Sequence, residues 1–404
     1  MERGGFNLLT FADQKEKPIP ANWPVDFVAY QGKNSTLDII NDPRVKEIKE
    51  KIGARLAYVF KNNFLIEKAM AELGLSPLNP AADLIEKIEG KVSQTNFLPE
   101  LKEYFPEFII TQSNAISFAE LKKELGEKMV AQFNTSHSGA GTFLLTENLW
   151  SEWQEKFPQR PIRVSRFVTG KTITINLVVL PTAVIVGAPS WQLTGLADLT
   201  EHQFTTVGNA WITFDLAIKN QVETIAQNVG AVLQKNNFFG PAGLDLIFDE
   251  LSEKLYLIEI NARQPASFNL ESWLQKLGGQ KGLFDYLADF WQGKILPRAF
   301  EPVVIAGGQV VVRAKSDWCG IIKSTPKTGV YGLDNGQLVL TAEKPFLSAK
   351  NEFLAHFCPI SRRVLAGDEV FRVQTGKNFV INGNLSDEIN IIIGGLKSQV
   401  SFDK

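Results

Sequence analysis

Three polar side chains interrupt an apolar stretch late in the middle of the chain, and their spacing is the first sign of chemistry. Glu259, Asn261 and Arg263 recur at every second position, so in an extended strand they share one face. Asp245 interrupts an earlier apolar run in the same way. A charged turn separates the two runs, which predicts a hairpin that brings Asp245 opposite Glu259.

Two carboxylates and an amide oxygen that converge from neighbouring strands form a set of hard oxygen ligands. Such a set holds Mg²⁺ and leaves positions for water and phosphate oxygens. Arg263 beside them has the fork geometry that binds an anion bidentately. The alternative interpretation is a solvated strand face with a surface ion pair, and the residues alone leave both open.

A second candidate is the loop between two apolar extended runs, at 129–133 and 143–145. The backbone N–H groups of its small residues can approach and cradle a phosphate, and the hydroxyls of Ser136, Ser138 and Thr142 add donors. The order strand, loop, strand is a hairpin and differs from the strand, loop, helix order of a P-loop. A glycine-containing turn without a ligand is the alternative.

Regular elements must position these candidates. Apolar spacing and capping signals predict helices at 42–52, 63–73, 117–125 and 221–234. The predicted strands are 162–167, 172–180 and 183–186, as an antiparallel meander, then 244–248 and 255–260. A β-rich tail begins near residue 303. The pattern indicates an α/β protein.

The composition bounds the class of protein. Its 404 residues, 44% hydrophobic and 21% charged, predict two or three globular domains. With 42 Lys plus Arg against 44 Asp plus Glu, the net charge of -2 argues against nucleic acid and membrane as partners. Two cysteines and three histidines in no metal-ligand spacing argue against disulfides and structural zinc. Without a secretory signal or a long apolar run, we expect a cytoplasmic protein.

The loop that follows a strand, the run Arg166-Phe-Val-Thr-Gly170, and Gly243-Leu-Asp245 followed by Glu259-Ile-Asn-Ala-Arg263 together resemble the ATP-grasp superfamily of carboxylate–amine ligases. The resemblance spans roughly residues 60 to 270. It implies a fold in which two α+β subdomains grip the nucleotide. The expected division is a short N-terminal α/β unit (1–95), an ATP-grasp core (96–290) and a β-rich C-terminal lobe (291–404).

The resemblance also implies roles for single residues. Asp245, Glu259 and Asn261 would ligate Mg²⁺, or Mn²⁺ in its place, and Arg263 would be the catalytic residue that steadies the transferred phosphate or acyl phosphate. In this scheme the loop folds over the β- and γ-phosphates of ATP, and the hinge backbone reads the adenine edge. The residues implied to bind ATP are Gln132, Ser136, His137, Ser138, Gly139, Ala140, Gly141, Thr142, Arg166, Phe167 and Val168.

The chain departs from the family pattern at the phosphate-binding cations. Gln132 stands where the family usually has a lysine, and Lys128 on the same strand is the nearest substitute. A second lysine is expected near Asn62 and Asn63, with Lys61 adjacent. No acidic residue follows the hinge glycine, so the ribose contact stays unassigned. Loss of both cations would weaken phosphate binding.

The function implied is an ATP-dependent ligase. ATP would phosphorylate a carboxylate, and attack by an amine on the acyl phosphate would give an amide or peptide, ADP and phosphate. Amino acids or peptides are the expected substrates, because the chain lacks the Met-Lys-Met biotin-attachment signature. The alternatives are a biotin-carboxylase-like or nucleotide-biosynthesis ligase, and a non-catalytic nucleotide-binding or interaction module. A homodimer is the default expectation for the assembly.

Overall fold

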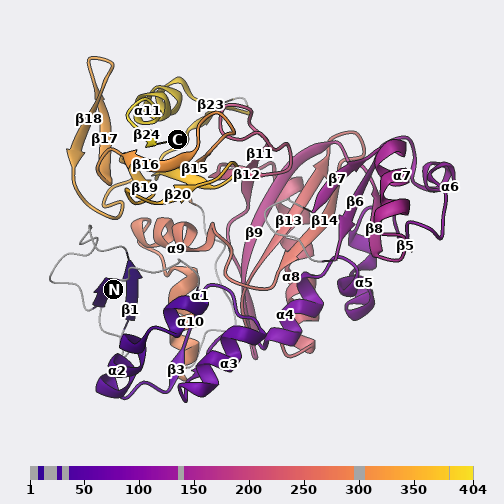
Figure 1. The fold of residues 1–404 in the computed structure, drawn as a ribbon, viewed down its shortest axis with the longest axis horizontal. Helices are drawn as coiled ribbons and strands as arrows, with labels where there is room; N and C mark the ends of the chain where they lie inside the picture. Colours follow the sequence, from indigo (N-terminus) through magenta and orange to yellow (C-terminus); the bar gives the residue numbers. More distant parts are fainter. Residues whose placement is uncertain are drawn as a thin grey trace.

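The computed structural model describes residues 8–12, 25–29, 36–134, 141–294, 305–381 and 383–403. Within these ranges the chain forms one large antiparallel sheet, a separate four-stranded sheet and helices packed on both (Figure 1). The predicted α/β class is confirmed. No helix in the described ranges is long and apolar enough to cross a membrane.

The large sheet joins the middle of the chain to its C-terminal part. Its strand order is β14-β13-β9-β11-β12-β15-β21-β19-β17-β18, and β10 pairs with β9. The bounds are Gly170–Leu180 (β9), Ala183–Val186 (β10), Ser190–Thr194 (β11), Thr206–Trp211 (β12), Gly240–Asp249 (β13), Lys254–Asn261 (β14), Gly307–Arg313 (β15), Gly329–Asp334 (β17), Gln337–Ala342 (β18), Phe353–Phe357 (β19) and Glu369–Thr375 (β21). Because β12 pairs directly with β15, the sheet runs across residue 291, where the C-terminal lobe is predicted to begin.

Helices pack on both sides of this sheet. Helix α8 (Leu216–Lys235) buries an apolar stripe that includes Val222 and Val229 in one core with β9, β13 and β14. Helices α9 (Phe268–Leu277) and α10 (Leu283–Trp291) bury Phe268 and Leu287 against Val178 of β9. From Ile173 onward strand β9 is therefore buried on both faces, and it pairs along its length with β13 of the acidic hairpin.

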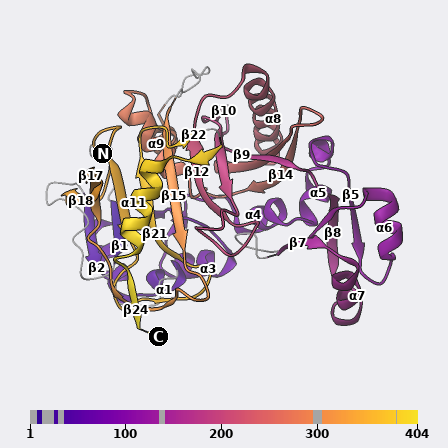
Figure 2. The same ribbon diagram turned by 90° about the horizontal axis from the view of Figure 1, so that it is seen from above.

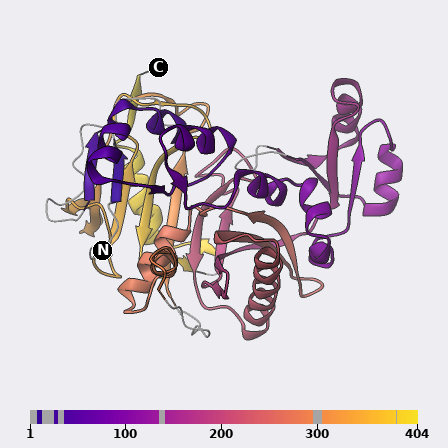
Figure 3. The same cartoon turned by 90° about the horizontal axis from the view of Figure 1, so that it is seen from below.

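The small sheet has its own core. Its order is β5-β8-β6-β7, with bounds Phe108–Gln112, Pro161–Arg166, Met129–Phe133 and Thr142–Leu145. Helices α6 (Phe118–Leu125) and α7 (Glu147–Lys156) cover it, and Trp150 and Trp153 of α7 are buried in one core with its strands. Ser117 caps α6 through a capping box, as its sequence predicts. Figures 2 and 3 show this sheet at one end of the molecule and the C-terminal strands at the other.

The predicted meander is wrong at one step. Strand β8 pairs with β5 and β6, whereas β9 pairs with β10, β11 and β13. Residues 167–169 therefore carry the chain from one sheet to the other instead of closing a hairpin. The β9–β10 hairpin itself is confirmed, with Ala183 opposite Leu180.

The N-terminal elements lead towards the small sheet. Helix α2 begins after the capping residue Asp42 and ends at Gly53, whose φ of 65° suits glycine. The bounds are Leu8–Ala12 (β1), Val25–Ala29 (β2), Thr36–Ile40 (α1), Pro43–Ile52 (α2), Leu56–Ala57 (β3), Phe64–Glu72 (α3), Ser76–Pro77 (β4), Ala82–Glu89 (α4), Ser93–Phe97 (α5) and the 3-10 helix Pro99–Tyr104 (η1). Strands β1 and β2 pair in parallel.

The remaining C-terminal elements form a second layer on the large sheet. Helix α11 buries Ile389, Ile392 and Leu396 in a core shared with β15, β19 and β21. The bounds are Gly320–Ser324 (β16), Arg363–Val364 (β20), Val380–Ile381 (β22), Asn384–Leu385 (β23), Asp387–Lys397 (α11) and Ser401–Asp403 (β24). The predicted β-rich tail is confirmed, with one helix added.

Candidate functional site

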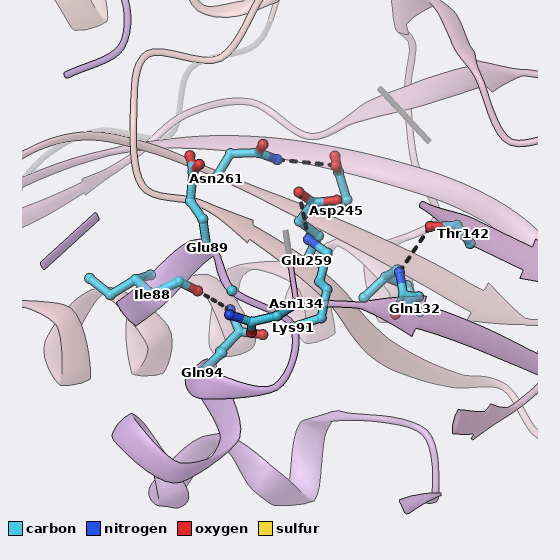
Figure 4. A network of polar contacts seen from close by, with 12 residues as sticks. Ile88, Glu89, Lys91, Gln94, Gln132, Asn134, Thr142, Asp245, Glu259 and Asn261 are labelled. Atoms are coloured by element: carbon cyan, nitrogen blue, oxygen red, sulfur yellow. Dashed lines mark hydrogen bonds and ion pairs between the residues drawn. The ribbon is translucent and has the colours of Figure 1, made fainter. Parts of the chain in front are cut away.

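A cavity of about 570 Å³ lies between the two sheets and helix α4. The small sheet contributes Gln132 and Thr142, and the acidic hairpin contributes Asp245 and Glu259. The far end is lined by polar residues of β12, β15 and β21, among them Thr206, Asn209, Gln309, Arg313, Glu369 and Arg372. Figure 4 shows the polar network at the end near α4.

The acidic hairpin has the register that the sequence predicts. Asp245 on β13 lies opposite Glu259 on β14, and the register shifts directly after this pair. Asp245 accepts hydrogen bonds from Thr174 Oγ1 at 3.0 Å, Gln192 Nε2 at 3.0 Å and Asn261 Nδ2 at 3.2 Å. Three donors on one carboxylate hold it in a single orientation. The alternative interpretation, a solvated strand face with a surface ion pair, is therefore wrong.

The two carboxylates titrate differently. Burial raises the pKa of Asp245 to about 6, and the negative charge of Glu259 adds to the shift. Burial is the strongest influence on Glu259 and opposes its ionisation, but the Lys91 ammonium together with the guanidinium groups of Arg263 and Arg163 holds the pKa of Glu259 below its ordinary value. Both groups are thus mainly ionised at neutral pH. Among the described residues only Lys91 forms an ion pair with either of them.

This charge balance fits a divalent cation. Asp245, Glu259 and Asn261 supply two carboxylates and one amide oxygen, the ligand chemistry that Mg²⁺ prefers. The part of the chain that is described holds no group of three or more His, Cys, Asp or Glu side chains suited to a metal. A metal here would therefore depend on these three residues together with water and phosphate oxygens.

Lys91 is a cation of the site that the sequence interpretation missed. It lies between α4 and α5, its side chain is 3% exposed, and its Nζ is 2.7 Å from Glu259 Oε1. Asn134 holds the turn around it: the Asn134 carbonyl accepts from Lys91 N, and Asn134 Oδ1 accepts from Val92 N and Ser93 N. The sequence feature that could have indicated Lys91 is Gly90-Lys91, which directly follows an amphipathic helix.

The side chain of Arg263 is held at the same end of the cavity. Its Nε is 3.2 Å from Glu89 Oε1, and one terminal nitrogen donates to Asn261 Oδ1 at 2.9 Å. Glu89 also pairs with Lys61 at 2.6 Å, so one carboxylate of α4 bridges two cations. Lys61 lines the cavity, whereas Asn62 and its neighbour offer no charge there.

The structure places part of the predicted phosphate loop. Gln132 Nε2 donates to Thr142 Oγ1 at 3.2 Å across the base of the β6–β7 hairpin, and both side chains line the cavity. The carbonyl of Gly141 accepts from Phe133 N. The other members of the loop fall in the range 135–140, outside the described residues: Ser136, His137, Ser138, Gly139 and Ala140.

Of the predicted hinge residues, Arg166 ends β8 and Phe167 and Val168 follow it, and none of the three lines this cavity. Arg166 donates to the hydroxyl of Tyr256 at 3.0 Å, and Val168 is buried. The amide of Phe167 donates to the carbonyl of Lys128. The Lys128 side chain itself is exposed and lies outside the cavity lining. The expectation that Lys128 replaces the lysine missing at position 132 is therefore wrong.

Residues 88–267, which contain Lys91 and the acidic hairpin, match a family model described as an ATP-grasp domain. No curated protein matches the sequence.

Three solved structures illustrate the likeness of the fold. The biotin carboxylase domain of a 2-oxoglutarate carboxylase from Hydrogenobacter thermophilus has a TM-score of 0.62 at 13% identity, over 93% of this chain and 82% of that chain. Biotin carboxylase from Campylobacter jejuni gives 0.63 at 12% identity, over 93% and 82%. N5-carboxyaminoimidazole ribonucleotide synthetase from Thermotoga maritima gives 0.58 at 12% identity, over 99% and 94%. At such identities the likeness concerns the fold, and it confirms the predicted one.

Proposed function

We propose that this protein is an ATP- and Mg²⁺-dependent carboxylate–amine ligase, because residues 88–267 match a family model described as an ATP-grasp domain. In the first step a carboxylate oxygen attacks the γ-phosphorus of ATP, and ADP leaves. In the second step an amine attacks the acyl phosphate, an amide bond forms, phosphate leaves, and the amine gives up a proton. Amino acids or peptides are the proposed substrates.

The observation that carries this proposal is the convergence of Asp245, Glu259 and Asn261 in one cavity, with the buried Lys91 ammonium 2.7 Å from Glu259 Oε1. When bound, Mg²⁺ would neutralise charge on the β- and γ-phosphates. Asp245, Glu259 and Asn261 would hold it, and two solved relatives of this fold are described with ADP, one as its magnesium salt.

The chain's own cations complete the proposal. Lys91 and Arg263 border the carboxylates, so they would attract the phosphates and stabilise the charge that develops on the transferred group. Glu89 fixes the direction of the Arg263 guanidinium from α4. Such chemistry depends on positioning and charge stabilisation, so it requires no Ser or Cys nucleophile.

A second candidate is a ligase whose carboxylate is bicarbonate and whose product is a carbamate. The likeness to N5-carboxyaminoimidazole ribonucleotide synthetase favours it, because that alignment covers 99% of this chain and 94% of the other, C-terminal lobe included. The biotin carboxylase domain from Hydrogenobacter thermophilus is described in complex with bicarbonate.

ADP release in the presence of Mg²⁺ and ATP tests both candidates. The acceptors are single amino acids, pairs of amino acids, and bicarbonate with simple amines. Release that needs amino acids supports the first candidate, and release that needs bicarbonate supports the second. Glu259→Gln should lower the rate about 100-fold or more, whereas Glu343→Gln, an exposed carboxylate paired with Lys327, should not. Nucleotide binding without turnover with any acceptor would instead indicate a non-catalytic module.

A further inference from the structure

Arg163 is a buried cation next to the cavity that neither the sequence nor the family match assigns to the site. It lies on β8 directly opposite Gln132 of β6, and it is 2% exposed. One terminal nitrogen donates to Gln132 Oε1 at 2.7 Å and to the carbonyl of Ile258 at 3.1 Å. Its Nε and other terminal nitrogen are buried without a hydrogen-bond partner.

These contacts fix the orientation of the Gln132 amide. Because Arg163 has only donors, it must face the amide oxygen, so the amide nitrogen of Gln132 points the other way. That nitrogen donates to Thr142 Oγ1 at 3.2 Å, and the Gln132 side chain lines the cavity. Its second N–H remains for a ligand, since an amide carries two donor hydrogens.

The guanidinium of Arg163 lies 5.2 Å from the centre of the Phe105 ring, but no carboxylate is paired with it among the described residues. Burial lowers the pKa of Arg163 to about 10, which leaves the guanidinium protonated at neutral pH. Within the described part of the chain Arg163 forms no ion pair. The carboxylate of Glu259 acts on its pKa through charge, but Glu259 already pairs with Lys91. An uncompensated buried charge is costly, and an anion in the neighbouring cavity would offset that cost.

We infer that Gln132 and Arg163 act as one phosphate-binding unit, in which Gln132 donates its free amide N–H to a phosphate oxygen of the nucleotide and Arg163 is the positioning residue that orients the amide and supplies the positive charge. The inference rests on the proposed function, because it assigns residues to the phosphates of the proposed ATP. It also accounts for the absence of a lysine at position 132: the cation has moved to the neighbouring strand.

A charge-exchange experiment tests the unit. Affinities for Mg²⁺·ATP and for tripolyphosphate are measured by calorimetry for Arg163→Met, Gln132→Lys and the double variant. Arg163→Met should weaken both about tenfold or more, the loss expected when a charge-assisted hydrogen bond is removed. Gln132→Lys alone should also weaken them, because it places a second cation against Arg163. The double variant, which returns one cation to the cavity wall, should recover to within about threefold of the wild type.

Further measurements separate this role from simple packing. Arg163→Met should leave adenosine affinity unchanged, because adenosine has no phosphate; equal losses for adenosine and ATP would overturn the inference. Arg160→Met is the matched control, since Arg160 stacks on Phe133 near the same sheet and lies outside the cavity lining. If Arg163→Met does not fold, Arg163→Lys is used instead. Its shorter side chain should no longer reach the Gln132 amide, so an unchanged affinity for phosphate would contradict the inference.

The test distinguishes failure of the inference from failure of the proposed function. Tripolyphosphate binding that depends on Arg163 and Gln132, without binding of Mg²⁺·ATP, would retain the phosphate unit and reject the ATP-dependent ligase. If all three variants bind both probes as tightly as the wild type does, the phosphate unit is rejected and the proposed ligase is not affected.

Discussion

At the scale of single residues, the partly buried carboxylate of Asp245 makes the stability of the protein depend on pH. Its pKa is raised to about 6 in the folded protein, so ionisation costs folding free energy as pH rises from the unfolded value of about 4 to about 6. We expect Asp245→Asn to be more stable than the wild type at pH 7.5 by on the order of 2 kcal/mol, and by much less at pH 4.5. Urea unfolding at both pH values measures this.

The same variant should lose the stabilisation that Mg²⁺·ATP gives, since one proposed metal ligand is gone. Asp334→Asn, at an exposed strand end, is the control and should behave like the wild type in every respect. The raised pKa of Asp245 would be contradicted if the stability gained by Asp245→Asn over the wild type were smaller at pH 7.5 than at pH 4.5.

Removal of Lys91 should be far more costly than removal of a surface lysine. Lys91→Met leaves Glu259 half-buried without its ion-pair partner, and breaking such a pair costs about 3 kcal/mol. Lys87→Met breaks only the exposed pair with Asp83, worth about 0.5 kcal/mol or less. Chemical denaturation compares the two variants, and Mg²⁺·ATP affinity should fall only in Lys91→Met.

The difference between Asp245 and Lys91 shows which parts of the site were accessible from sequence. Asp245 and Glu259 belong to one hairpin, so period-two spacing and a short turn were enough to predict that they meet. Lys91 reaches Glu259 from a turn between two helices distant in sequence, and nothing local fixes that approach. The sequence pattern therefore did not point to the buried Lys91, and the second lysine was expected near Asn62 and Asn63 instead.

At the scale of elements, Asn134 connects the end of β6 to the turn that carries Lys91. Its Oδ1 accepts from the amides of Val92 and Ser93 at 2.9 and 3.0 Å. Asn134→Ala should cost about 1 to 2 kcal/mol and weaken Mg²⁺·ATP binding, because Lys91 would lose its fixed position. Asn134→Asp keeps an acceptor oxygen for both amides and should restore stability. Thermal unfolding and calorimetry follow the two effects, and an Asn134→Ala variant with wild-type affinity would show that Lys91 is held by other means.

Element pairing shows the limit of the sequence interpretation most clearly. Strands β8 and β9 are both apolar, alternate, and are joined by residues 167–169, so local pattern favours a hairpin. The fold instead pairs β8 with β5 and β6 because each sheet buries a separate core, one around Trp150 and Trp153 and the other around Ile173 and Leu244. Strand type follows from local sequence, but the choice of partner is made by long-range burial.

At the scale of the whole molecule, two bodies with separate cores face each other across the cavity. The chain enters the small sheet after η1 and leaves it through residues 167–169. Polar contacts between the bodies include those of Arg163 with Ile258, of Arg166 with Tyr256 and of Asn134 with the Lys91 turn. Phe108 of β5 also packs against the core of the large sheet. Interfaces between the domains of one chain commonly permit relative motion.

A nucleotide that binds both bodies should therefore restrict that motion. We expect Mg²⁺·ATP to slow amide exchange about tenfold or more at 129–134 and 90–93, which line or border the cavity. Strand β19, whose backbone pairs on the far side of the large sheet, is the internal control and should not change. Glu259→Gln should abolish the protection, because without a complete metal site the phosphates no longer link α4 and the small sheet to the acidic hairpin. Equal protection in that variant would mean that the nucleotide is held without the hairpin, and the carboxylate pair would then have to serve the second substrate.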